Sequence, residues 1–176
     1  MTAFWTLLFG AFLATAGGFW QVQHARNQER KSLKAALAAE IRAILSVIEQ
    51  RHYVAGLEGF IASIDPQRND LFQIRIARDY DVVFRSNCSK IGLLPPDIAE
   101  RIVQFYFLIS SAIEDIKLLA DAYASPELRL PWSLHTVDGS RRFHQELLEI
   151  SRQAIAAGEA LAADLVRPTG RDEVPD

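Results

Sequence analysis

The chain has 176 residues, of which 49% are hydrophobic and 23% charged, and its formal net charge is −3. This length accommodates one domain of ordinary size and one accessory segment. The slightly acidic charge argues against a nucleic-acid-binding protein, which needs a basic surface to neutralise phosphates. The single cysteine, Cys88, excludes both an internal disulfide framework and a cysteine-based zinc site.

The N-terminal part of the chain is apolar and uncharged, since no Asp, Glu, Lys or Arg precedes Arg26. Residues 3–22 are long enough, as a helix, to cross the ~30 Å hydrocarbon core of a lipid bilayer. Trp5 and Trp20 lie near the two ends, where indole rings favour membrane interfaces, and mainly basic residues follow. We therefore predict a single-pass anchor over residues 1–23 in the inner cell membrane, with the N-terminus outside and the C-terminal domain in the cytoplasm.

Two features of this segment leave alternatives open. Ala14-Thr15-Ala16 has the small-x-small form of a signal-peptidase site, although the absence of a preceding Lys or Arg favours an uncleaved anchor. Gly10, Ala14 and Gly18 recur every four residues and form a candidate helix-association face, because small residues allow close approach of helices in membranes. The alternative is that small residues are simply common in such helices.

Residues 24–166 carry the spacing of a helical bundle. Residues 27–64 follow a helical period without proline, and Gly56 and Gly59 predict a break near residues 52–59. No helix-breaking residue separates the anchor from this helix, so we expect the two to be continuous as a membrane-proximal stalk.

Two further long helices complete the prediction. The clearer one follows Pro95-Pro96, and the other covers about residues 140–166 with a proline after it. Residues 71–84 remain open between helix, strand and loop, and residues 167–176 are expected to be a disordered tail. The sequence thus predicts an all-α protein, in which an N-terminal transmembrane helix precedes a cytoplasmic antiparallel bundle of three long helices with short helical pieces.

The sequence contains no recognisable catalytic or cofactor motif, neither a phosphate-binding glycine loop nor a G-x-S-x-G element. Glu49 and His52 form one Glu-x-x-His pair, whereas a di-iron bundle needs two such pairs and further inward-facing glutamates. These two residues are therefore only weak candidates for metal ligands. We predict no cofactor and no enzymatic activity, and keep a carboxylate–histidine metalloenzyme as an alternative hypothesis.

The segment before the second long helix combines apolar side chains with a proline pair. Ile91, Leu93 and Leu94 form a candidate docking loop for a partner protein. The alternative is that they cover the end of the bundle core, with Gly92 providing a turn. Cys88, close to Lys90, is either a reactive thiol or a small buried side chain.

The pattern Asn87-x-x-Lys90-Ile-Gly-Leu-Leu-Pro, followed by Phe105-Tyr106, resembles functionally uncharacterised bacterial proteins that consist of one membrane-anchoring span and helices. The resemblance covers about the middle quarter of the chain. It implies a bacterial inner-membrane setting, and it implies no activity, cofactor or catalytic residue.

These features together predict a membrane-anchored helical interaction or scaffold protein, or a small regulatory subunit, on the cytoplasmic side. The expected partners are the lipid bilayer and either another protein or a second copy bound through the membrane helix and the bundle. No nucleic acid is expected. A homo-oligomeric membrane structural element remains an alternative besides the metalloenzyme.

Overall fold

The computed structural model describes residues 2–65, 72, 74, 79–124 and 136–167. Within these residues every regular element is a helix, so the predicted all-α class is confirmed. The elements are α1 (Thr2–Gln50), α2 (Tyr53–Ser63), α3 (Val82–Asn87), the 3₁₀ helix η1 (Cys88–Leu93), α4 (Pro96–Ala124) and α5 (Val137–Val166). The predicted tail lies outside the described residues, apart from Arg167.

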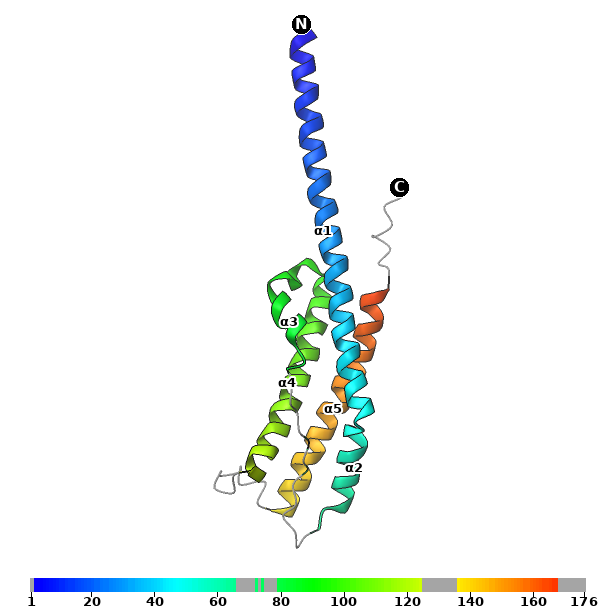
Figure 1. Ribbon diagram of the computed structural model, residues 1–176, viewed down its shortest axis with the longest axis vertical. Coiled ribbons are helices and arrows are strands. Elements are labelled where there is room, and N and C mark those ends of the chain that lie inside the picture. The colour runs from blue at the N-terminus through cyan, green and yellow to red at the C-terminus, as the bar shows by residue number, and fades with distance from the viewer. Residues whose placement is uncertain (1, 66–71, 73, 75–78, 125–135, 168–176) are drawn as a thin grey trace.

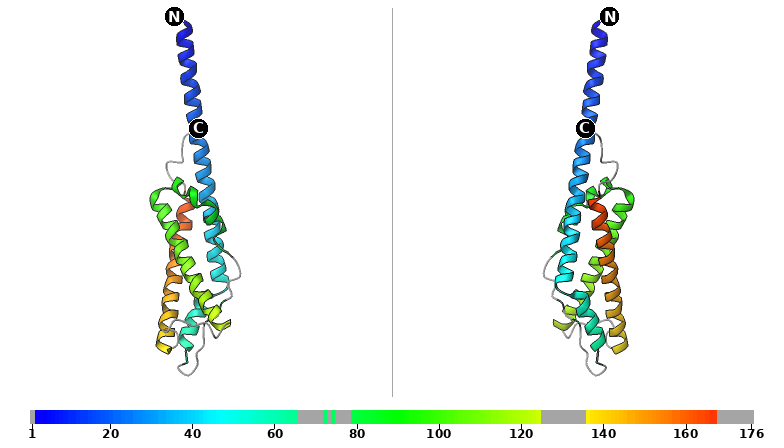
Figure 2. Two further views of the ribbon diagram at one scale, coloured as in Figure 1. Left: turned by 90° about the vertical axis from the view of Figure 1, so that its left-hand side faces the viewer. Right: turned by 90° about the vertical axis from the view of Figure 1, so that its right-hand side faces the viewer.

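The three long helices α1, α4 and α5 form an elongated bundle, from which the N-terminal half of α1 projects (Figure 1). Helices α1 and α4 run in the same direction, and α5 runs antiparallel to both (Figures 1 and 2). Helix α5 packs against α1, α2 and α4, whereas α1 and α4 make no close backbone contact in the described part of the chain. The central helix of the bundle is therefore α5.

The structure requires a correction at the N-terminus. Among the residues it describes, no helix is both long enough and apolar enough to cross a membrane. Helix α1 is continuous over 49 residues, and its described side chains from Gln21 to Ser32 are mostly polar. We therefore correct the predictions of a transmembrane anchor over residues 1–23 and of single-pass membrane localisation with a cytoplasmic bundle.

The first bundle helix ends at a break that the glycines do not cause. Helix α1 ends at Gln50, and His52 adopts the left-handed conformation (φ 52°, ψ 37°) before α2 begins. This backbone conformation is uncommon for non-glycine residues, although histidine tolerates it better than most. Gly56 and Gly59, which predicted the break, both lie inside α2.

The core consists of two clusters stacked along the bundle. One lies between α1, η1, α4 and α5 and includes Leu37, Phe105 and Leu161. The other lies around α2, the second half of α4 and the first half of α5, and includes Leu57 and Leu147. The helical periodicity on which the sequence prediction rested thus corresponds to buried or half-buried faces of the helices.

Gly158 on α5 allows a close approach of side chains from two other helices. A Cβ atom at this position would lie 2.6 Å from Cε2 of Phe105 and 3.2 Å from Cδ2 of Leu45. These side chains come from α4 and α1, and Phe105 is fully buried. The missing side chain at Gly158 therefore lets both neighbouring helices pack on α5 at the same level.

We predict that Gly158→Ala destabilises the protein by about 1–2 kcal/mol, because the added methyl group overpacks a close-packed core at a cost of about 2–3 kcal/mol. This cost outweighs the gain of about 1 kcal/mol that alanine brings to a helix over glycine. The free energy of unfolding, measured by urea denaturation, checks the prediction.

Gly59→Ala is the matched control, because the added Cβ at this exposed helical position would meet no atom within 4 Å. This control variant should be unchanged or more stable by up to about 1 kcal/mol. Equal unfolding free energies for the Gly158 variant and wild type would contradict the packing account.

Candidate functional site

The weak metal candidates, Glu49 and His52, lie at the junction between α1 and α2, and both are exposed. The main-chain N–H of His52 donates to the carbonyl oxygen of Glu49 at 2.9 Å, which closes the end of α1. In the described segments, no group of three or more His, Cys, Asp or Glu side chains is placed to hold a metal ion. Glu49 and His52 thus lie at a helix break, and within the described residues they are not part of a group that could hold a metal ion.

The predicted docking loop coincides with η1 and the residue after it. Ile91 and Leu94 are buried in the core, and only Leu93 is partly exposed. Cys88 is exposed, and its thiol donates to the carbonyl oxygen of Phe84 at 3.3 Å. Two of the three apolar side chains of the predicted docking loop are thus packed in the bundle core.

The candidate helix-association face at Gly10, Ala14 and Gly18 is described only in part. The side-chain surroundings of Gly10 and Ala14 lie outside the described residues, although both belong to α1. Gly18 is exposed, and a Cβ there would meet no atom within 4 Å.

The carboxylate of Glu40 on α1 is a junction between three helices. It accepts hydrogen bonds from the main-chain N–H groups of Val83 (2.6 Å) and Phe84 (3.0 Å) at the start of α3. It also accepts a hydrogen bond from the hydroxyl of Tyr106 on α4, at 2.6 Å. Asp81, at the N-cap position of α3, makes no side-chain capping bond, so Glu40 supplies from another helix what a cap residue normally supplies locally.

Aromatic packing reinforces this junction. The ring of Phe84 stacks on that of Tyr106 with centroids 4.0 Å apart, and Phe105 meets Tyr106 edge to face at 5.1 Å. Burial, and then the hydrogen bond to Glu40, raise the pKa of Tyr106 far above that of a free tyrosine. The phenol therefore stays protonated and remains a hydrogen-bond donor.

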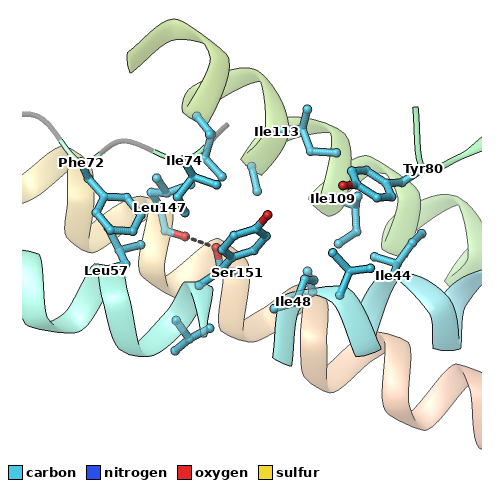
Figure 3. A pocket seen from close by; sticks show the side chains of 16 residues that line it. Ile44, Ile48, Leu57, Phe72, Ile74, Tyr80, Ile109, Ile113, Leu147 and Ser151 are labelled. Carbon is cyan, nitrogen blue, oxygen red and sulfur yellow. Dashed lines mark hydrogen bonds between the residues drawn. The ribbon is translucent and has the colours of Figure 1, made fainter. Parts of the chain in front are cut away.

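An apolar pocket of about 70 Å³ lies over α5, between α1 and α2 on one side and α4 on the other (Figure 3). Phe72 and Leu57 stand near one end, and Tyr80, Ile44 and Ile109 near the other (Figure 3). The lining side chains come from all these helices and from the chain between α2 and α3. They are Ile44, Val47, Ile48, Tyr53, Val54, Leu57, Phe72, Ile74, Tyr80, Ile109, Ala112, Ile113, Ile116, Leu147, Ser151 and Ala154.

The outer face of α4 presents exposed apolar side chains. Phe107 is 72% exposed and Val103, four residues before it, is 52% exposed. The two lie on the same side of the helix because residues four apart are neighbours on a helical surface. Glu100 and Glu114, seven residues to either side of Phe107, are exposed carboxylates on the same strip.

His144 on α5 is the largest polar side chain that is fully buried among the described residues. Its Nδ1 lies 2.7 Å from the carbonyl oxygen of Ser140, which can only accept, so Nδ1 carries the proton and donates. Nε2 is then an unprotonated acceptor, and no described group donates to it. The ring packs against Phe60 of α2 at a centroid distance of 4.7 Å.

Neither Glu40 nor His144 stands out in the sequence as a site residue. Glu40 occupies one of many polar positions on α1, and its partners are 43 to 66 residues away in the chain. His144 follows the basic pair Arg141-Arg142, a sequence context that favours an exposed side chain, whereas the structure buries it.

Comparisons with protein-family models, with curated proteins and with solved structures find no match to this chain.

We predict that His144 makes the stability of the protein dependent on pH. Burial lowers the pKa of His144 below the ordinary value of 6.5, and the bond to Ser140 offsets this only in part. The unfolded chain therefore binds a proton at higher pH than the folded chain, so this contribution to stability is complete above pH 6.5 and decreases as pH falls below it.

The free energy of unfolding of wild type and of His144→Leu, measured from about pH 7.5 to about pH 5, checks this prediction. As pH falls, the difference should shift in favour of the leucine variant. His24→Gln, which changes an exposed histidine, should follow the wild-type profile. A constant difference between wild type and His144→Leu would contradict the assignment.

Proposed function

We propose that this chain is a helical interaction module, acting as a scaffold or a small regulatory subunit, that binds a partner protein through the outer face of α4. The observation that carries the proposal is the exposure of Phe107 and Val103 on a helix whose opposite face is fixed in the core. Aromatic side chains at the centre of an interface supply much of the binding energy in protein complexes.

The rigidity of α4 supports this proposal. Ile102, Phe105 and Ile109, on its inner side, are buried, so the exposed strip is held in one geometry. On its flank, Arg101 forms an ion pair with Asp164 of α5 at 2.7 Å. A binding surface held in this way loses little conformational entropy on association.

The chemistry of the strip favours one class of partner. The apolar centre at Phe107 lies between the exposed carboxylates of Glu100 and Glu114. A partner surface with an apolar centre and basic residues around it would complement both features, the charges acting mainly on specificity and association rate.

The test uses the full-length protein in its native cells, with benzoylphenylalanine in place of Phe107. Irradiation should yield a covalent adduct with another protein, identified by mass spectrometry. The same photoreactive residue at Gln145, an exposed position of α5, should not yield this adduct.

Binding of the identified partner to purified wild type and to Phe107→Glu then measures the contribution of this side chain. Affinity should fall by about tenfold or more, whereas stability should change by less than about 0.5 kcal/mol because the side chain is exposed. Adducts to the chain itself would indicate self-association instead, and equal labelling from positions 107 and 145 would contradict the proposed surface.

A further inference from the structure

The apolar pocket lies at a boundary within the core. Ile44, Ile109 and Ala154 belong to the core cluster between α1, η1, α4 and α5, and Leu57 and Leu147 belong to the cluster around α2. The α1–α2 break at His52 lies at the same level, since both the end of α1 and the start of α2 line the pocket. The pocket therefore lies where the side chains of the two clusters do not pack fully against each other.

The lining offers almost no polar contact. No charged side chain belongs to the described lining, and its polar side chains are those of Ser151, Tyr53 and Tyr80. The Ser151 hydroxyl already donates to the carbonyl oxygen of Leu147 at 2.8 Å, and the Tyr53 hydroxyl accepts from Arg51 at 3.2 Å. Because a stably bound water needs two to four polar partners, this pocket suits an apolar occupant better than water.

Size and shape narrow the choice of occupant. The volume of about 70 Å³ is less than half of the ~150 Å³ of an engineered cavity that holds benzene. The lining extends from Phe72 and Leu57 at one end to Tyr80 and Ile44 at the other (Figure 3). A narrow, elongated space of this kind accepts a flexible chain more readily than a ring.

We propose that this pocket is a binding site for the end of an unbranched aliphatic chain carried by a small uncharged molecule. Burial of each methylene group from water favours binding by roughly 0.8 kcal/mol, and the uncharged lining provides no partner for an ionic group. This inference is independent of the α4 surface, which lies on the other side of that helix.

Isoleucine methyl groups report directly on the site. Six isoleucines line the pocket, namely Ile44, Ile48, Ile74, Ile109, Ile113 and Ile116. Other isoleucines, among them Ile91, Ile98 and Ile155, do not line it. A titration of the full-length, Ile-δ1-methyl-labelled protein with 1-hexanol, followed by NMR, therefore separates binding in the pocket from general solvent effects.

We expect saturable shifts at the six lining isoleucines and much smaller shifts elsewhere. Cyclohexanol, with the same number of carbon atoms in a ring, should bind at least about tenfold more weakly, a difference of about 1.4 kcal/mol. Uniform, non-saturating shifts would overturn the proposal, and equal binding of the two alcohols would overturn the assignment to an aliphatic chain.

Ala112→Leu fills the pocket from α4 and should abolish the saturable shifts. Ser110→Leu adds the same kind of side chain at an exposed position of the same helix and should leave them unchanged. Ile113→Phe fills the pocket from another lining position and keeps the test decisive if the first variant does not fold. Wild-type binding of 1-hexanol by a folded, filled variant would overturn the proposal.

Discussion

The half-buried carboxylate of Glu40 on α1 links this helix to α3 and α4, whose contacting residues are far away in the sequence. Glu40 accepts hydrogen bonds from two main-chain N–H groups of α3 and from the Tyr106 hydroxyl of α4. The first N–H groups of a helix have no acceptor within the helix, so α3 depends on Glu40 for its start. Although α1 and α4 make no close backbone contact within the described residues, the Tyr106–Glu40 hydrogen bond joins them directly, and the Phe84–Tyr106 stack holds α3 against α4.

The position of α5 explains the remaining architecture. Gly158 lets α1 and α4 approach α5 together, and α5 then lies between two helices that run parallel to each other. Lower in the bundle, the break at His52 turns the chain into α2, and the apolar pocket opens over α5 at this level. The proposed α4 surface and the proposed pocket thus lie on opposite sides of one helix, held by the same core.

The periodic apolar positions of the long helices could be predicted from the sequence, because heptad spacing directly encodes a buried helix face. The predicted membrane anchor was not supported, and the break after α1 came from His52 rather than from Gly56 and Gly59. Phe107 directly follows the buried Phe105 and Tyr106 in the apolar sequence of α4, but it is exposed. Periodicity gives the angular position of a side chain, whereas its burial depends on which neighbouring helix is present.

The site residues were harder to predict for the same reason. The Glu40 junction depends on contacts between residues that are distant in the chain, and no local sequence pattern predicts such contacts. The pocket exists because the side chains of the two core clusters do not fill the space between them. This depends on how the helices pack together, which cannot be read from the residue types alone. Tyr106 was noticed only as part of a resemblance, which carried no indication of its hydrogen bond.

Amide hydrogen exchange at Val83 and Phe84 tests the central claim, that Glu40 holds α3 on the bundle. Both amides lack an acceptor within α3, so protection against exchange must come from the Glu40 carboxylate. We predict exchange at least about a hundredfold slower than in an unstructured chain, and loss of this protection in Glu40→Ala while the core amides of α4 stay protected. Rapid exchange of both amides in the wild-type protein would contradict the account.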